Sequence, residues 1–232
     1  MDYPELSARL DEVRARIGAA ASRAGRAAEE VGIVAVTKTH PATAVEAARR
    51  VGLRDVGENR VQEMEEKEEL VGRDAARWHL IGHLQRNKAR RAVPLFDLLH
   101  SLDSARLARA LSEAAVEQGS TVRALAQVNT SGEESKGGFE GDALVDALGE
   151  ITALPGLVVE GLMTMAPFTD DERVLRHAFG EARRLRDEAA RQVPAFRPVH
   201  LSMGMSNDFE IAVEEGSTLV RLGTILFGAR EP

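Results

Sequence analysis

Four lysines stand out among the 30 basic residues of the chain, because every other basic side chain is an arginine. They are Lys38, Lys67, Lys88 and Lys136. A lysine amine can lose its proton and attack a carbonyl group, whereas a guanidinium stays protonated. Lys38 follows an apolar run of strand character, residues 32–36, and is the first candidate for amine chemistry. The alternative is a solvated strand end, where a long cation extends from apolar surface into water.

The other three lysines have simpler explanations. Lys67 follows Glu63 by four residues in the acidic segment QEMEEKEEL, which predicts a solvated helix face carrying an ion pair. Lys88 lies in the basic segment LQRNKARR, which is better interpreted as a helix start with surface charge. Lys136 lies in a polar, glycine-rich segment and is a reserve candidate for reaching carbonyl compounds.

Two segments near the end of the sequence have the composition of an anion site. LSMGMSND (201–208) places Ser206 before a predicted helix, and VRLGTILFG (220–228) places Gly223 and Thr224 after a short apolar run. Hydroxyl groups and free backbone N–H groups at a helix start bind phosphate. Taken singly, these residues are better explained as a helix cap and a packing glycine. Their joint placement after the last two strands makes the phosphate interpretation as good as the structural one.

Eight short apolar runs alternate with segments of helical periodicity, which predicts an α/β fold. Eight such units favour a closed (β/α)8 barrel of the TIM type over an open doubly wound sheet, which normally uses fewer strands at this length. The predicted strands are Ile33–Thr37, Asp55–Glu58, Trp78–Gly82, Leu98–Ser101, Val122–Asn129, Leu157–Thr164, Val199–Met203 and Leu219–Leu222.

The helical segments complete this prediction. An additional N-terminal helix spans about Tyr3 to Glu30 within residues 1–31, and residues 32–228 form the barrel. No composition break or linker divides the chain, so residues 1–232 are expected to form a single domain. The segment 130–141 is predicted to be a flexible loop, either over the barrel mouth or as a plain connection. Further helices are predicted at Ala42–Val51, Arg60–Val71, Ser104–Gln118, Asp142–Ala153 and Asp171–Gln192.

The composition excludes several classes of protein. The chain of 232 residues is 44% hydrophobic, and its formal charge of -7 argues against binding nucleic acid or an anionic membrane. It has no cysteine, and its histidines and carboxylates show no metal-ligand spacing, so no metal is predicted. His79 and His100 are interpreted as core or rim histidines. With no signal-peptide pattern and no apolar stretch near the roughly 20 residues that span a bilayer, a cytoplasmic protein is predicted.

The barrel prediction brings the candidate residues together, because active sites of such barrels lie at the C-terminal ends of the strands. A lysine amine beside a phosphate site suits two chemistries, since both pyridoxal phosphate and sugar phosphates can form a Schiff base with lysine. Composition and spacing leave both open. The candidates follow or end the first, second, seventh and eighth strands: Lys38, Asn59, Ser206, Arg221, Gly223 and Thr224.

Seven motifs occur in order along nearly the whole chain: VAVTKTHP (34–41), GENRVQE (57–63), WHLIGHLQRNK (78–88), SGEESKGGF (131–139), GLMTMAP (161–167), LSMGMSND (201–208) and VRLGTILFG (220–228). In these motifs the sequence resembles the pyridoxal phosphate homeostasis protein family. The resemblance implies a fold type III barrel, like that of alanine racemase, with pyridoxal 5'-phosphate (PLP) as its cofactor.

The resemblance also implies roles for single residues. Lys38 matches the lysine that holds PLP as a Schiff base, and Arg221 matches the arginine that faces the pyridine nitrogen. Asn59 falls in the motif near the cofactor ring. His83 lies where the motif varies and receives no role. The phosphate contacts match Ser206, Gly223 and Thr224.

The family is associated with vitamin B6 homeostasis rather than with an established reaction. The resemblance therefore implies a PLP-binding protein, expected to be a monomer, that supplies or regulates PLP, with apo PLP-dependent enzymes as partners. A cation beside the ring nitrogen disfavours protonating that nitrogen, which restrains carbanion chemistry. Robust catalysis is accordingly not expected.

Two enzyme functions remain as alternatives. One is a PLP-dependent racemase-like enzyme, although two-base racemases of this fold use a tyrosine from a second domain. The only tyrosine here, Tyr3, is expected to lie far from the barrel mouth. The other alternative is a Schiff-base aldolase acting on sugar phosphates.

Overall fold

Short runs rich in valine, leucine and alanine form the central strands, all paired in parallel. The computed structural model describes residues 3–132 and 137–228. Neighbouring strands in the sheet follow the order β4-β3-β2-β1-β9-β8-β7-β5, and a further β4–β5 pairing closes the barrel. The predicted eight-stranded barrel is confirmed. The strands are β1 (Gly32–Val36), β2 (Asp55–Glu58), β3 (Arg77–Leu80), β4 (Leu98–Leu102), β5 (Val122–Asn129), β7 (Leu157–Met163), β8 (His200–Ser202) and β9 (Leu219–Leu222).

Successive side chains along the strands point alternately into two apolar layers. Side chains inside the barrel form a small cluster that includes Val34, Leu98 and Leu219. Their sequence neighbours pack outward in a larger core that includes Ala35 and Val220. Because side chains in a strand alternate between faces, Arg221 shares the interior face with Leu219.

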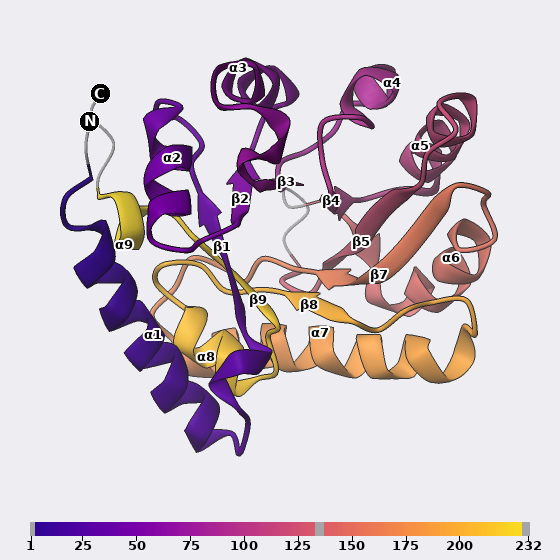
Figure 1. The fold of residues 1–232 in the computed structure, drawn as a ribbon. Helices are drawn as coiled ribbons and strands as arrows, with labels where there is room; N and C mark the ends of the chain where they lie inside the picture. Colours follow the sequence, from indigo (N-terminus) through magenta and orange to yellow (C-terminus); the bar gives the residue numbers. More distant parts are fainter. Residues whose placement is uncertain (1–2, 133–136, 229–232) are drawn as a thin grey trace.

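Helices surround the barrel, with α2, α3, α4 and α5 along its upper side in Figure 1 and α7 and α8 along its lower side. α5 illustrates why these segments are helical. The Ser104 hydroxyl caps the helix by accepting a hydrogen bond from the Leu107 N–H (3.3 Å), and Leu107 and Leu111 share the buried face. The helices are α2 (Thr43–Arg50), α3 (Val61–Val71), α4 (Ala89–Ala92), α5 (Ala105–Glu117), α6 (Leu144–Ile151), α7 (Glu172–Gln192), α8 (Phe209–Glu214) and α9 (Thr224–Phe227).

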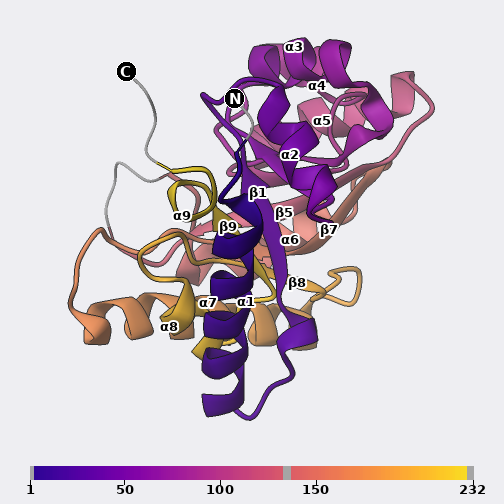
Figure 2. The ribbon, with the colours of Figure 1, turned by 60° about the vertical axis from the view of Figure 1, so that its left-hand side comes forward.

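The additional N-terminal helix is shorter than predicted. α1 covers Leu6–Arg23, and a separate 3-10 turn follows at Ala28–Glu30. Gly25, at a positive φ of 67°, ends the helix in the manner of a C-terminal glycine cap. α1 lies in front of the barrel and beside α8 (Figure 2). Ion pairs join the two helices: Arg16 to Glu210 and Arg23 to Glu214, each at 2.6 Å.

The segment 130–141 is more ordered than predicted where the structure describes it. Phe139–Glu140 forms β6, which pairs in parallel with β5 through Val128 and Asn129. Gly138 brings the two segments together: a Cβ there would lie 2.8 Å from the Gln127 carbonyl oxygen. The prediction of an irregular loop is therefore wrong for residues 139–140. Lys136, the reserve amine, lies outside the described residues.

None of the helices in the described ranges is both long enough and apolar enough to cross a membrane.

Candidate functional site

A pocket of about 580 Å3 opens at the C-terminal end of the barrel, between the segments that follow β1, β7, β8 and β9. Among its described lining residues, Lys38 is the only lysine. The wall thus brings together an amine, a guanidinium, hydroxyl groups and the first turn of α9. Five of the six predicted site residues line it: Lys38, Ser206, Arg221, Gly223 and Thr224.

Lys38 lies in a tight turn directly after β1. The His40 N–H donates a hydrogen bond back to the Thr37 carbonyl (3.0 Å), which closes the turn. Thr39 adopts a left-handed conformation with φ of 66°, which is uncommon for a β-branched residue. The Glu63 carboxylate accepts a hydrogen bond from the Thr39 N–H and supports this conformation. The turn places the half-buried Lys38 side chain on the pocket wall.

A second lysine, Lys67, lies behind this turn, in an environment that differs from the predicted one. The solvated position predicted for Lys67 is wrong, because only 5% of this residue is exposed. Its Nζ donates to the Thr37 carbonyl (2.7 Å), to Glu58 Oε1 (2.7 Å) and to Glu63 Oε1 (2.9 Å). The predicted pair with Glu63 is present, but it is part of a buried group. We call Thr37, Glu58, Glu63 and Lys67 the Lys67 cluster.

Glu58 is the acid at the centre of the Lys67 cluster. It is fully buried at the end of β2, and its Oε1 also accepts a hydrogen bond from the Thr37 hydroxyl. Its Oε2 has no hydrogen-bond partner within the described part of the chain. Burial raises the pKa of Glu58 to about 7, while Lys67 and Thr37 act in the opposite direction. A carboxyl group that titrates near neutral pH therefore lies next to the backbone that positions Lys38.

A spacing pattern in the sequence indicates that Lys67 is buried. The buried residues of α3 are Val61, Met64 and Lys67, each three residues after the previous one. Residues at that spacing share one helix face, so Lys67 belongs to the face that packs on the barrel. The many glutamates around it hid this pattern.

Arg221 reaches the pocket from the barrel interior. Its Nη1 donates to the Ser202 carbonyl (2.8 Å) and to the Ser202 hydroxyl (2.7 Å), and its Nη2 donates to the Thr164 carbonyl (3.0 Å). Burial lowers the pKa of Arg221 to about 10, and Asp208 opposes this effect. The guanidinium therefore stays protonated near neutral pH. It is held by oxygens of Ser202, at the end of β8, and of Thr164, directly after β7.

The anion-site segments also meet in the pocket. Ser206 lies in a turn in which the Met205 N–H donates to the Asp208 carboxylate (2.6 Å). Ser206 Oγ accepts a long hydrogen bond from the Ile225 N–H (3.4 Å), which connects this turn to the first turn of α9. Gly204, at φ of 93°, permits the turn, because a Cβ there would lie 2.6 Å from a side-chain carbon of α8.

Comparisons with known proteins identify the family of the chain. The family model described as the N-terminal domain of alanine racemase matches residues 8–231. A pyridoxal phosphate homeostasis protein of Pseudomonas aeruginosa is 40% identical over 227 residues, covering 97% of this chain and 96% of that protein. One from Aquifex aeolicus is 41% identical over 199 residues, covering 86% and 87%. The chain belongs to the pyridoxal phosphate homeostasis protein family.

A solved structure that is similar to this chain in sequence has the same fold. The structure of PipY from Synechococcus elongatus with PLP bound has a TM-score of 0.86 and 37% identity, covering 96% of this chain and 100% of that chain. The family resemblance predicted from the seven motifs is therefore confirmed.

The pocket fits PLP in the chemistry of its polar groups. PLP carries an aldehyde, a pyridine nitrogen and a phosphate. An amine, a guanidinium and a group of hydroxyl and backbone donors stand on one wall, and these are suitable partners for the three. A Cβ on Gly223 would lie 3.3 Å from the Val36 carbonyl oxygen, so the start of α9 passes close to β1 without a side chain between them.

Asn59 does not line the described pocket wall, unlike the other predicted residues. It packs behind it, against Gly82: a Cβ on Gly82 would lie 2.2 Å from the Asn59 carbonyl oxygen and 2.5 Å from its Oδ1. This close approach keeps the β2 and β3 ends together, next to Ile81 on the wall.

Tyr3 lies at the mouth end of the barrel, so the prediction of a remote tyrosine is wrong. Its hydroxyl is 3.2 Å from His40 Nδ1, two residues beyond Lys38. Its ring packs edge-on against Phe227, with centroids 5.4 Å apart. Tyr3 is nevertheless absent from the described lining of the pocket. The sequence offered no signal for this contact, because Tyr3 and His40 meet only through tertiary packing.

A larger recess of about 890 Å3 lies beside the mouth, between the β3–α4 segment and α5. His83 lines it and pairs with Asp103 (Nδ1 to Oδ2, 2.8 Å). No lysine is present among its described lining residues. The pocket at Lys38 is the candidate site, because its described lining contains an amine beside Ser206 and Arg221.

Proposed function

We propose that this chain binds PLP covalently through Lys38 and serves vitamin B6 homeostasis in the cytoplasm. The observation that carries the proposal is the presence of Lys38, Ser206 and Arg221 on one pocket wall. The bound PLP in the solved structure of PipY supports it, as does the name shared by the relatives. The single domain predicted for residues 1–232 and the monomeric state belong to the same proposal.

Each group on the wall has a separate task in this proposal. When bound, PLP supplies an aldehyde that condenses with a primary amine, releasing water, and a ring that withdraws electrons. Lys38 contributes the amine. Arg221 would serve as the partner of the ring nitrogen and, as a cation, would disfavour protonation of that nitrogen. Ser206 and the N–H groups of Gly223 and Thr224 hold the phosphate, and Asn59 supports the wall from behind.

The absorbance spectrum is the test of this binding mode. Purified protein should be yellow, and borohydride should bleach the visible band and fix the cofactor to the chain. Peptide mapping should then place the adduct on Lys38. An adduct on any other lysine would overturn the assignment. An aldolase would be colourless as purified and would be trapped by borohydride only together with its sugar-phosphate substrate.

We infer further that the protein carries or regulates PLP, with apo PLP-dependent enzymes as recipients. The buried cation at Arg221 supports this inference, because it opposes protonation of the ring nitrogen and so weakens the ring as an electron sink. Loaded protein should activate an apo PLP-dependent enzyme. It should produce no substantial racemisation, transamination or decarboxylation of common amino acids.

A racemase-like activity is the second candidate, favoured by the family-model match and by the position of Tyr3 near His40. Rapid turnover of an amino acid that requires both Lys38 and the Tyr3 hydroxyl would support it over the carrier function. Tyr3→Phe is the variant that separates the two, since it removes only the hydroxyl. If cofactor transfer and turnover are both absent, the homeostasis role reduces to PLP binding.

A further inference from the structure

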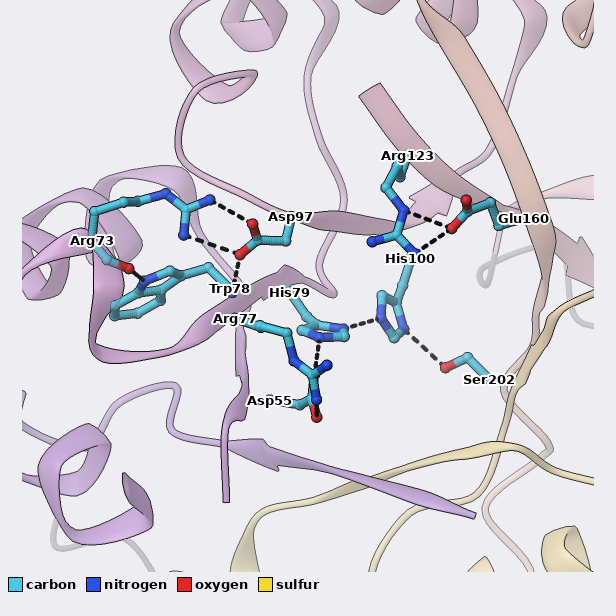
Figure 3. A network of polar contacts seen from close by, with 10 residues as sticks. All are labelled: Asp55, Arg73, Arg77, Trp78, His79, Asp97, His100, Arg123, Glu160 and Ser202. Atoms are coloured by element: carbon cyan, nitrogen blue, oxygen red, sulfur yellow. Dashed lines mark hydrogen bonds and ion pairs between the residues drawn. The ribbon is translucent and has the colours of Figure 1, made fainter. Parts of the chain in front are cut away.

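A chain of hydrogen bonds, from Asp55 through His79 and His100 to Ser202, crosses the barrel interior (Figure 3). Asp55 Oδ1 lies 3.0 Å from His79 Nε2, and His79 Nδ1 lies 2.8 Å from His100 Nε2. His100 Nδ1 then lies 2.9 Å from Ser202 Oγ, which also accepts a hydrogen bond from Arg221 Nη1 at 2.7 Å. Five strands contribute one residue each: β2, β3, β4, β8 and β9.

The chain connects the two ends of the barrel. Asp55 is the first residue of β2 and lines a cavity of about 450 Å3 at the N-terminal ends of the strands. Ser202 is the last residue of β8, and Arg221 lines the cofactor pocket. His100 and Ser202 are fully buried between them. A change at one end can therefore reach the other through hydrogen bonds alone.

The chemistry of the two ends fixes the order of the protons. Arg221 can only donate, so Ser202 Oγ must accept from it. Asp55 is a carboxylate near neutral pH: burial acts against this, but the hydrogen bonds from His79 and Arg77 hold its pKa below the ordinary value. His79 therefore directs an Nε2 proton at Asp55, and the proposed order assigns its Nδ1 the role of acceptor.

The rest of the order follows link by link. With His79 Nδ1 as the acceptor, His100 donates to it from Nε2, and Nδ1 of His100 accepts the Ser202 hydroxyl proton. Burial, and the positive charge that His79 and Arg221 would add, hold the pKa of His100 well below its ordinary value, so it stays neutral. Each link then contains one proton. The charged and titratable groups around the two imidazoles are Asp55, Arg77, Asp97, Arg123, Glu160, His200 and Arg221.

We propose that Asp55, His79 and His100 are positioning residues that hold Ser202 and Arg221 in one hydrogen-bond order, with every donor in the chain directed from Ser202 toward Asp55. In this order both lone pairs of Ser202 Oγ remain available on the Arg221 side. The guanidinium is thereby held in one place at the pocket by oxygens alone. The inference rests on the proposed function only for the statement that Arg221 meets the cofactor ring.

Histidine tautomers provide a direct test on the full chain, labelled with 15N-histidine. Long-range proton–nitrogen correlation spectra near neutral pH, assigned with His79→Gln and His100→Gln, should show both imidazoles neutral with the proton on Nε2. Loading with PLP should leave these tautomers unchanged. A charged His100, or one protonated on Nδ1, would overturn the proposed order. Because the spectrum of the PLP-free protein is sufficient, this result does not depend on cofactor binding.

Asp55→Asn tests whether the carboxylate sets the order. An amide donates as readily as it accepts, so His100 should gain a signal for the form protonated on Nδ1. The pH midpoint of the visible absorbance of bound PLP should shift as Ser202 turns. Arg77→Lys is the matched control, because it alters a residue that contacts Asp55 Oδ2 (2.5 Å) but keeps a cation there, and it should change neither readout.

The outcomes distinguish a failure of the positioning role from a failure of the proposed function. An unchanged His100 tautomer in Asp55→Asn would refute the positioning role even if the variant were less stable. A changed tautomer with an unchanged PLP absorbance would also refute it, because the chain would then end at Ser202 without affecting the pocket. Absence of any PLP adduct on Lys38 would instead refute the proposed function and leave the tautomer result standing.

Discussion

Lys38 and Lys67 are both lysines near the end of β1, but their environments differ. Lys38 belongs to the turn that follows β1, and Lys67 donates a hydrogen bond to the same turn. Lys38 is half-buried and stands on the wall of a pocket. Lys67 is buried, and its ammonium group donates to three oxygens within 2.9 Å. Burial and three hydrogen bonds hold the Lys67 amine away from the described pocket wall, whereas a carbonyl compound in the pocket can approach Lys38. The comparison shows that two residues of the same type can differ in access to a pocket because of their surroundings alone.

The largest contrast between the two lysines is expected from Lys38→Ala. It should abolish both the visible absorbance and the adduct fixed by borohydride, because no amine is left on the described wall. Lys38→Arg should behave in the same way, since a guanidinium keeps the charge but does not condense with an aldehyde. Mass spectrometry of the reduced protein measures the outcome. An adduct of normal yield on Lys67 in either variant would contradict the assigned difference.

Lys67→Ala should act on stability instead. It leaves Glu58 buried without its partner, which typically lowers the free energy of unfolding by about 3–5 kcal/mol. Chemical denaturation measures this loss. Glu66→Ala, in the same helix but exposed, should stay within about 0.5 kcal/mol of the wild type. A loss below about 1 kcal/mol for Lys67→Ala would place the pair among ordinary surface ion pairs.

The acid in the Lys67 cluster gives stability a pH dependence. The pKa of Glu58 rises from 4.5 to about 7 on folding, so the folded protein keeps a proton that the unfolded chain releases in that range. This contribution to stability is present below about pH 4.5 and is lost as the pH rises to about 7, with a slope of up to about 1.4 kcal/mol per pH unit. Denaturation curves at several pH values should show the slope in the wild type and not in Glu58→Gln. Parallel curves for the two proteins would refute it.

Ser206→Ala is expected to have the smallest of these effects. Losing one hydrogen bond to a charged phosphate typically costs about 1.5–3 kcal/mol, or roughly 10- to 100-fold in affinity. Dialysis of the PLP-loaded protein measures the retained cofactor. Ser120→Ala, exposed just before β5 at the other end of the barrel, is the control and should retain PLP normally. Equal retention in both variants would place the phosphate elsewhere.

Most of the barrel could be predicted from sequence, because buried parallel strands are continuous apolar runs. Three predicted strands, Asp55–Glu58, Val122–Asn129 and Leu219–Leu222, match β2, β5 and β9 at both ends. β6 could not be predicted in this way. It has two residues in a polar, glycine-rich segment, and its pairing with β5 depends on the fold of the rest.

The candidate-site residues that could be predicted from the sequence are those that lie at or just after the C-terminal ends of strands. Lys38, Ser206 and Arg221 follow or end strands, and the barrel rule brought them together. The partners of Arg221 could not be read from the chain, since Thr164 and Ser202 approach it only through strand register. Lys67 was misread because charge dominated the local pattern, whereas its three-residue spacing from Met64 decided its burial.

The pairing of β1 with β9 has a consequence for how the protein is made. These two strands carry Lys38 and Arg221 toward one pocket, yet they are separated by most of the sequence. Contacts between such distant segments form late and slow the folding of a domain. β1 gains this partner, and α1 gains its ion pairs with α8, only after the last part of the chain has been synthesised. The pocket wall that holds Lys38 and Arg221 is complete only when β1 and β9 are both in place, so it depends on the first and the last strand of the barrel together.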